Sequence, residues 1–398
     1  MKEKFTILLP IGKEETAMDF RLTEEQTLLR KMIQNFAKKE VAPSAAQRDE
    51  EARFDENIVR KMAEIGIMGI PWPEKYGGFE SDYVNFVIAV EELSRTCAST
   101  GVTLSAHTLL TSWSIYKYGT EEQKKTYLKR LATGELLGAF AISKSHNRNN
   151  VTSLSTTVKK DGESYILNGN TMSVINGGIA DVYIVFAKND TSSNHFGISA
   201  CIVKKGVKGF TIGKKEKKLG IRSCPTTELM FENCRIRKQN ILLEEEKGYV
   251  VLKTALDVHS SSLAAQAVGI AQAALDAALQ YAKERKQFGK PIVENQAISF
   301  KLANMATEIE AARLLTYQAA WLESNGHNSV KAASMAKQFA CDVAMKATME
   351  AVQIFGGYGY TKEFPVERYM RDAKMIQISK DMYDTHRFIA ERSPYVAD

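Results

Sequence analysis

Several features that would place the chain in a special class of protein are missing from its sequence. No run approaches the ~18 consecutive apolar residues of a membrane span, and there is no low-complexity segment or internal repeat. The five cysteines are scattered, without a CxxC pair or a CxxC…HxxxH spacing: Cys97, Cys201, Cys224, Cys234 and Cys341. This pattern predicts neither a disulfide framework nor a metal site, and it fits a reducing cytoplasm.

The chain also lacks a large excess of positive or negative charge. Lys plus Arg exceed Asp plus Glu by only 53 − 47 = +6 over 398 residues. So small an excess is compatible with anionic small ligands but does not indicate nucleic-acid binding. The 44% of hydrophobic and 25% of charged residues are an ordinary globular mixture. At roughly 150 residues per domain, the length predicts two or three domains.

The N-terminal 17 residues contain an apolar stretch, Phe5–Ile11, which Pro10 interrupts and charged residues follow at once. A secretory signal peptide needs a longer apolar region and a small-residue cleavage site. We therefore expect residues 1–17 to form a disordered or strand-like extension.

The hydrophobic period divides the rest of the chain into three domains. Residues 18–137 read as a helical domain, with Thr23–Gln26 and Thr120–Gln123 as capping boxes. Residues 138–245 change to short β-branched runs between turn signals, and Asp161-Gly162 is a strong hairpin signal. This segment predicts a small β domain, which we expect to form a barrel.

Helix returns in residues 246–398. The segment 250–285 has no proline and an alanine-rich apolar face, and as one helix it would be roughly 54 Å long. Further amphipathic stretches run over 296–323 and 329–354, and a shorter one begins near Pro365. The fold class is therefore α+β, with an N-terminal helical domain, a middle β-barrel domain and a C-terminal four-helix bundle.

Long strings of the sequence carry a family resemblance. They are ERKQFGKPI (284–292), KLANMATEIEAARLL (301–315), AVQIFGGYGY (351–360), PVERYMRDAK (365–374), GIPWPEKYGG (69–78), VEELSRTCASTGVTLSAHT (90–108) and GKKEKKLGIRSCPTTELMFENCRI (213–236). In these strings the chain resembles the acyl-CoA dehydrogenases, most of all the short-chain, butyryl-type bacterial enzymes. The resemblance implies an FAD-dependent homotetramer or dimer that removes an α-proton and a β-hydride from an acyl thioester. It also implies reoxidation by an electron-transfer flavoprotein.

The resemblance further implies where the cofactor binds. It assigns the ADP half of FAD to residues of two subunits: Arg285, Phe288 and Gln296 of one, and Gln353, Gly356 and Gly357 of the other. A guanidinium suits a pyrophosphate, and paired glycines allow the backbone to approach a ligand closely. Taken alone, the string QIFGG at 353–357 is equally consistent with a simple helix stop.

The positions that carry the family's chemistry do not match its motifs. The family's TEPxAGSD, WITN, LDxxR and YEGT stand here as SKSHNRNN (143–150), SVIN (173–176), LDVHS (256–260) and SKDM (379–382). Lys380 therefore stands at the position of the catalytic glutamate. On the substrate side the matching positions hold Asn149, Asp257 and Ser260. Because the scaffold strings are intact, these clustered changes predict impaired or redirected dehydrogenation.

Three residues are candidates for the missing base. Lys380 with an ordinary pKa would be a cation at pH 7 and could not accept the proton. Asp381 is one residue along, where a side chain points in another direction. His259 stands where the isovaleryl-type enzymes carry their base, and an imidazole is mostly neutral at pH 7. The alternative for His259 is an ordinary buried or capping histidine.

The changed motifs also leave the function open among three hypotheses. Lys144, Arg148 and Lys380 make the site more basic, which would suit a carboxylated or phosphorylated ligand, although a solvated loop is an equal alternative. The first hypothesis is a flavin-dependent oxidoreductase with an unorthodox base. The second is a non-redox or inactive homologue, and the third is a flavin-dependent oxygenase. Since the ring-side contacts to the flavin are changed, we expect FAD binding weaker than is usual in the family.

Overall fold

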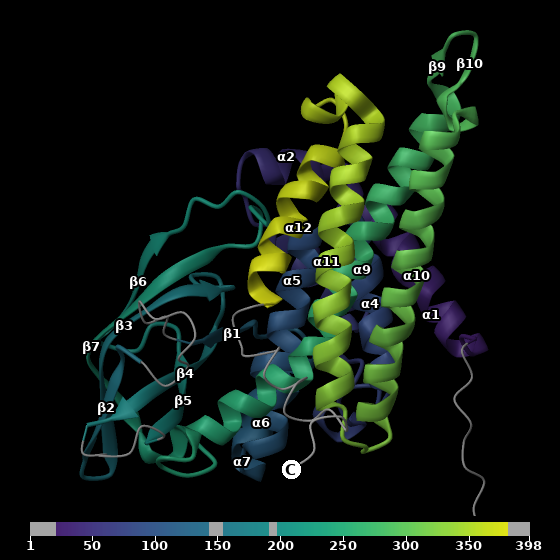
Figure 1. The fold of residues 1–398 in the computed structure, drawn as a ribbon. Coiled ribbons are helices and arrows are strands. Elements are labelled where there is room, and N and C mark those ends of the chain that lie inside the picture. Colours follow the sequence, from purple (N-terminus) through teal and green to yellow (C-terminus); the bar gives the residue numbers. More distant parts are fainter. Residues whose placement is uncertain (1–20, 143–153, 191–196, 381–398) are drawn as a thin grey trace, which may run out of the picture.

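A computed structural model of the chain describes residues 21–142, 154–190 and 197–380, and the following structural statements refer to these residues. Helices of the N-terminal and C-terminal segments pack side by side, and the β domain lies against one flank of them (Figure 1). The expected order of helical domain, β domain and helical bundle is confirmed.

The N-terminal domain is built from short helices. They are α1 (Glu24–Phe36), η1 (Ala37–Val41), α2 (Ala42–Glu50), α3 (Glu56–Glu64), η2 (Ile67–Gly69), η3 (Glu74–Tyr76), α4 (Tyr83–Thr96), α5 (Ala98–Ser105), η4 (Ala106–Ser112), α6 (Trp113–Tyr118), α7 (Glu121–Gln123), η5 (Lys124–Leu128) and α8 (Lys129–Ala132). Both capping boxes are confirmed: Thr23 with Gln26 opens α1, and Thr120 with Gln123 opens α7. These caps satisfy backbone N–H groups that the first helical turn leaves without a partner.

The middle domain is one eight-stranded sheet. Its strands are β1 (Gly138–Ala141), β2 (Thr157–Asp161), β3 (Ser164–Ile175), β4 (Val182–Asn189), β5 (Ile198–Lys204), β6 (Phe210–Lys215), β7 (Thr226–Arg237) and β8 (Ile241–Leu242). Their order is β6-β7-β3-β2-β4-β5-β8, and β1 pairs with β4. Within the described residues β6 and β8, the two ends of this order, do not pair with each other.

The expected hairpin is present, with its turn one residue later than its sequence signal. Asp161 still belongs to β2 and pairs with Ser164 of β3, which leaves Gly162 and Glu163 as the two turn residues. Gly162 has φ +61°, a conformation that glycine adopts at no steric cost.

The C-terminal domain packs four helices together: α9 (Gly248–Glu284), α10 (Gln296–Ser324), α11 (Val330–Phe355) and α12 (Val366–Lys380). Between α9 and α10 the chain makes a short arm of β9 (Lys286–Gln287), β10 (Lys290–Pro291) and η7 (Ile292–Glu294), and η8 (Gly356–Tyr360) follows α11. Among the described helices only α9 is long and apolar enough to cross a membrane, yet 78% of that window is buried inside the molecule. Its apolar residues therefore serve packing, as in the core helix of a bundle.

One buried histidine joins the N-terminal domain to the sheet. His107 on η4 donates from Nε2 to the Leu131 carbonyl (3.0 Å), and its Nδ1 accepts from the Gly138 N–H (3.0 Å). Burial lowers the pKa of His107 to about 4, so the ring is neutral at pH 7. This contact fixes the start of β1 against the helices that carry part of the candidate site.

Candidate functional site

Two of the expected site residues lie outside the described residues. Asn149 falls in the segment 143–153, and Asp381 falls in the segment 381–398. Lys380 is the last residue of α12, but its side chain is not among those described.

His259 lines a small cavity of about 60 Å³, which we call the inner cavity. The cavity lies where α5, η4, α9, α11 and α12 meet the end of β3. Its lining residues are Val102, Ala106, Leu110, Ile175, Leu256, His259, Ser260, Leu263, Gln266, Lys337, Met375, Ile376 and Ser379. The lining is apolar apart from a few polar side chains, and no carboxylate of the described chain belongs to it.

Hydrogen bonds fix which nitrogen of His259 carries the proton. Its Nε2 lies 2.9 Å from Ser105 Oγ, which lies 2.6 Å from Ser262 Oγ. Ser262 donates in turn to the His259 carbonyl (3.0 Å). Each hydroxyl has one proton to give, so with Ser262 donating to the carbonyl, Ser105 donates to Ser262 and accepts from Nε2–H of His259. Nδ1 is then left as the acceptor of the ring.

The environment of His259 keeps its imidazole neutral. His259 is half-buried, and the loss of hydration among the surrounding helices lowers its pKa to about 3; the positive charge of Lys337 adds to the effect. Lys337 lies on α11 and is buried. The imidazole can therefore accept hydrogen bonds at pH 7, but it is a much weaker base than an exposed histidine.

The other site residues on α9 and β3 are engaged in local contacts. Ser260 Oγ donates to the Leu256 carbonyl of its own helix (3.0 Å), and Asp257 pairs with Lys253 (3.6 Å). Ser173 has φ +59° and donates from Oγ to Glu216. The resemblance places an arginine at position 260, where this chain has a short hydroxyl that bonds the backbone of its own helix.

Some of the residues expected to bind the cofactor lie near the C-terminal end of α9, around a depression of about 560 Å³ that we call the outer depression. Arg285, Gly356 and Gly357 all line it. The Arg285 guanidinium lies 6.0 Å from the centre of the Tyr358 ring, and among the described residues it forms no ion pair. A Cβ atom added at either glycine would meet no atom within 4 Å. The site thus offers an unpaired guanidinium beside open backbone, which suits a pyrophosphate.

The remaining expected cofactor residues are exposed beside the outer depression without lining it. Phe288, at the turn of the β9–β10 arm, is 100% exposed, and Gln296 and Gln353 are also exposed. The resemblance placed Arg285 and the Gly356–Gly357 pair on different subunits, whereas one chain here brings both to the same depression.

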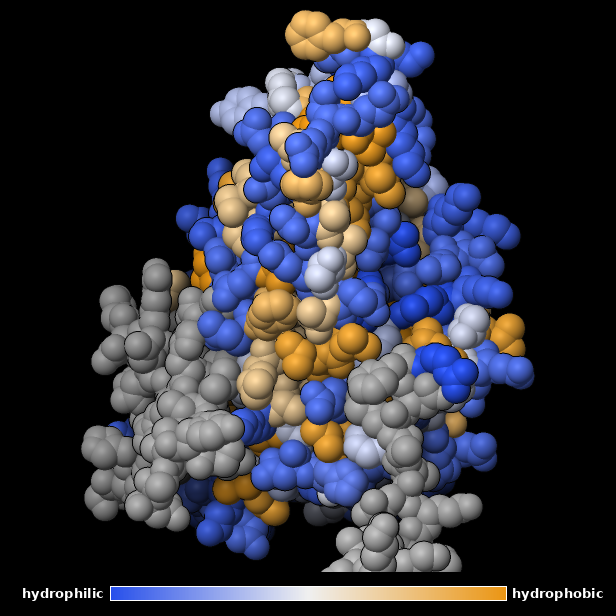
Figure 2. All heavy atoms as spheres, turned by 45° about the vertical axis from the view of Figure 1, so that its right-hand side comes forward, coloured by the Kyte–Doolittle hydropathy of each residue, from blue (hydrophilic) through white to orange (hydrophobic). Residues whose placement is uncertain are grey.

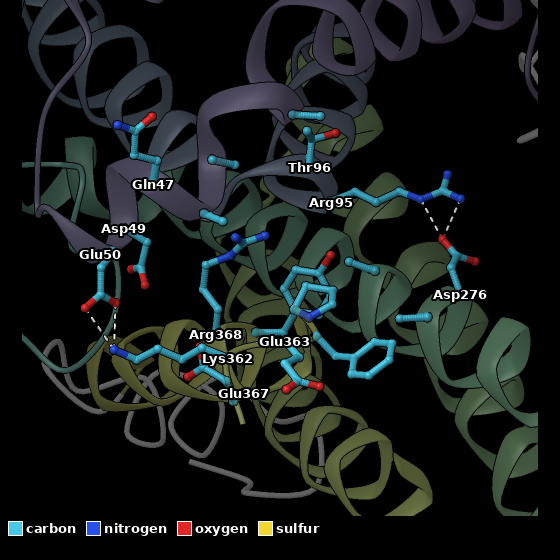
Figure 3. Close-up of a pocket in the computed structure, with 18 of the residues that line it drawn as sticks. Gln47, Asp49, Glu50, Arg95, Thr96, Asp276, Lys362, Glu363, Glu367 and Arg368 are labelled. Atoms are coloured by element: carbon cyan, nitrogen blue, oxygen red, sulfur yellow. Dashed lines mark hydrogen bonds and ion pairs between the residues drawn. The ribbon is translucent and has the colours of Figure 1, made fainter. Parts of the chain in front are cut away.

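A larger cavity, of about 920 Å³, lies between α2, the end of α4, α9 and the segment before α12 (Figure 3). Its charged walls pair with one another. Lys362 Nζ lies 2.7 Å from Glu50 Oε2, and Arg95 NH2 lies 2.6 Å from Asp276 Oδ2. Because these charges are neutralised and no expected site residue lines the cavity, we assign it no part in the site.

Three residues of the inner cavity and its hydrogen bonds were not expected from the sequence: Ser105, Gln266 and Lys337. Helical spacing could have indicated Gln266, because it follows His259 by seven residues and so lies on the same face of α9. Ser105 and Lys337 come from other helices, and no sequence spacing indicates them.

Comparisons with known proteins agree over the whole described chain. Family models described as "Acyl-CoA dehydrogenase" match with their N-terminal domain at residues 23–135, middle domain at 139–234 and C-terminal domain at 246–381. An acyl-CoA dehydrogenase of Bacillus subtilis (strain 168) is 48% identical over 371 residues, 93% of this chain and 98% of the relative.

Solved structures give the same result. Butyryl-CoA dehydrogenase from Megasphaera elsdenii has a TM-score of 0.91 at 42% identity, covering 94% of this chain and 99% of its own. A solved chain described with the electron transferring flavoprotein of Acidaminococcus fermentans has a TM-score of 0.93 at 46% identity, covering 96% and 100%.

Proposed function

Because the chain belongs to the acyl-CoA dehydrogenase family, we propose that it binds FAD and an acyl thioester and that its ordinary α,β-dehydrogenation is impaired or redirected. The observation that carries this proposal is the inner cavity, whose described lining contains no carboxylate. Abstraction of an α-proton needs an unprotonated base within hydrogen-bond reach. The family's glutamate position holds Lys380 instead.

His259 is the candidate base that belongs to the described cavity. With a pKa of about 3 its imidazole is unprotonated at pH 7, which a base requires. The same low pKa gives the ring little affinity for a proton, so transfer from a weakly acidic α-carbon is unfavourable. His259 therefore supports α-proton abstraction poorly, and thioester oxidation should be slow.

The outer depression fits the ADP half of FAD. Arg285 would pair with the pyrophosphate, while Gly356 and Gly357 leave room for it beside the backbone. FAD, when bound, supplies the acceptor for the substrate's β-hydride. At the ring end, Ser173 and Ile175 stand where the family has Trp and Thr, and Ser173 is already bonded to Glu216. If the contacts to the flavin ring are lost and the contacts to the ADP half are kept, FAD should bind more weakly but still bind.

The distance between the two cavities supports a shared site between subunits. His259 lies on α9 and Arg285 directly follows the helix, 26 residues further on, which at 1.5 Å per helical residue is about 39 Å. An extended dinucleotide does not reach that far. We infer that one FAD takes its ring contacts from one chain and its ADP contacts from another.

The surface of the bundle supports the expected assembly. Exposed apolar side chains lie on α10 and α11: Phe300, Met335, Phe339 and Met349. Apolar atoms run down this face among polar ones (Figure 2). We propose that the chain forms a homotetramer through such surfaces, with an electron-transfer flavoprotein as the expected acceptor. A single-chain mass at micromolar concentration in light scattering would contradict the assembly.

A non-redox homologue is the second candidate, and the absence of a carboxylate from the described lining is the observation that favours it. The absorption spectrum of the purified protein, before and after adding FAD, separates the two. Bound flavin gives visible absorption bands, and butyryl-CoA with an artificial acceptor then measures oxidation. We expect visible bands at partial occupancy and a rate several orders of magnitude below ordinary enzymatic rates.

Three results would count against the oxidoreductase proposal in different ways. A colourless protein that does not take up FAD would leave the non-redox candidate. Stoichiometric FAD after extended dialysis would refute weakened binding. Oxidation of butyryl-CoA at ordinary rates would refute the impairment, and His259→Ala would then identify the base.

A further inference from the structure

The inner cavity contains a buried amide that has no partner. Gln266 is 1% exposed and lines the cavity, and its Oε1 makes no hydrogen bond to any described residue. A buried amide oxygen without a partner is costly, because its hydration is lost and nothing replaces it. Such an atom points to a ligand or a water that supplies a donor.

A second acceptor belongs to the same cavity. The proton on Nε2 of His259 is used by Ser105, so Nδ1 carries the free lone pair of the ring. No hydrogen bond to Nδ1 exists among the described residues. His259 and Gln266 lie seven residues apart on one face of α9, and both side chains line the inner cavity.

We propose that His259 and Gln266 bind a hydroxyl group at the end of a short acyl chain inside the inner cavity. The proposal rests on the proposed binding of an acyl thioester. A hydroxyl donates one hydrogen bond and accepts others, so it can satisfy an acceptor at His259 or at Gln266 and also receive the amide N–H₂. A methyl group at the same place would offer neither a donor nor an acceptor to either residue.

The size and the protonation of the cavity restrict the ligand further. The inner cavity, at about 60 Å³, is far smaller than the outer depression of about 560 Å³, so it suits the end of a short acyl chain. A carboxylate only accepts hydrogen bonds and would face the lone pair of Nδ1. The positive charge of Lys337 opposes protonation of the ring, which keeps His259 an acceptor.

Two thioesters that differ in one group test the proposal. 3-Hydroxypropionyl-CoA carries a hydroxyl where butyryl-CoA carries a methyl, and calorimetric titration of the purified full-length protein gives a Kd for each. We expect the hydroxylated thioester to bind about tenfold more tightly or better, the effect of one additional satisfied partner. The variants His259→Leu and Gln266→Leu should each reduce this ratio towards one.

Val102→Ala is the matched control, because it changes the size of the same cavity without removing a polar group. It should shift both Kd values together and leave their ratio as in the unsubstituted protein. Equal binding of the two thioesters would overturn the hydroxyl site but leave the proposed thioester binding intact. If the ratio of the two Kd values is unchanged in both His259→Leu and Gln266→Leu, the hydroxyl site is also overturned. If neither thioester binds, the proposed function fails, and the hydroxyl site fails with it.

Discussion

Asn176 makes the contacts that hold the end of β3 beneath the candidate site, and its replacement by aspartate is the sharpest test of the structure. The side chain is 0% exposed, and Nδ2 donates to the carbonyls of Thr103 (3.1 Å) and Gly138 (3.2 Å). Its φ of +61° is one that asparagine and aspartate both tolerate. Asn176→Asp therefore keeps the shape and the backbone while it removes the amide donors.

The expected magnitude follows from the buried position of this side chain. An ionised carboxylate would face two carbonyl oxygens, so the pKa of the new carboxyl should rise above 7 in the folded protein. Keeping it protonated costs about 1.36 kcal/mol for each pH unit above an unfolded pKa of about 3.9, or about 4 kcal/mol at pH 7. A protonated carboxyl replaces only one of the two donors, which adds about 1 kcal/mol. The total is about 5 kcal/mol at pH 7 and about 2.5 kcal/mol at pH 5.

Urea unfolding followed by circular dichroism at pH 5 and pH 7 measures the loss of unfolding free energy at each pH, from the midpoint and slope of the first transition. The sign is definite: a carboxyl whose folded pKa is raised loses stability as pH increases. Asn176→Gly is the control, because it tolerates the same φ but carries no titratable group. It should lose about 2 kcal/mol at both pH values. If the loss of unfolding free energy in Asn176→Asp is the same at pH 5 and pH 7, the reasoning is refuted.

Three further predictions concern other positions. The pKa of His107 is about 4 in the folded protein and about 6.5 in the unfolded chain. Because only the unfolded chain gains the proton, the free energy of unfolding should fall by about 2 kcal/mol between pH 7 and pH 5. In urea unfolding, the free energy of unfolding of His107→Gln should depend less on pH. A Cβ at Gly220 would lie 2.1 Å from the Arg371 carbonyl oxygen. Gly220→Ala should therefore lower the melting temperature by several degrees. Gly357→Ala is the control and should not lower it, because a Cβ at Gly357 meets no atom within 4 Å. Lys380→Glu alone should raise butyryl-CoA oxidation by less than about tenfold, because the ring-side positions stay changed; full recovery of an ordinary rate would contradict the clustered loss.

The helices were largely predictable because their signals are local. The apolar period of 250–285 predicted α9 (Gly248–Glu284) to within two residues at each end, and the Thr–Gln pairs predicted the starts of two helices. Strand limits were less predictable. β7 runs over the 12 residues Thr226–Arg237, longer than the short β-branched runs indicate, because pairing with β3 extends it into residues with little strand propensity of their own.

The candidate site was predictable only along single elements. The sequence indicated His259 and Ser260 because both stand in one motif on α9, and Arg285 because its string is intact. It could not indicate that Ser105 meets His259, since 154 residues separate them and only the packing of α5 against α9 joins them. The low pKa of His259 was unpredictable for the same reason, because burial and Lys337 produce it.

The separation of the inner cavity from the outer depression along α9 has a consequence for how the protein is handled. A dinucleotide held at its ring end by one chain and at its ADP end by another is also a link between the chains. Association and cofactor loading then stabilise each other by mass action, so each becomes tighter when the other is complete. Dilution should release flavin, and added flavin should restore the associated form. A preparation found colourless at nanomolar concentration could regain its visible bands when it is concentrated with the cofactor, without any change in the polypeptide.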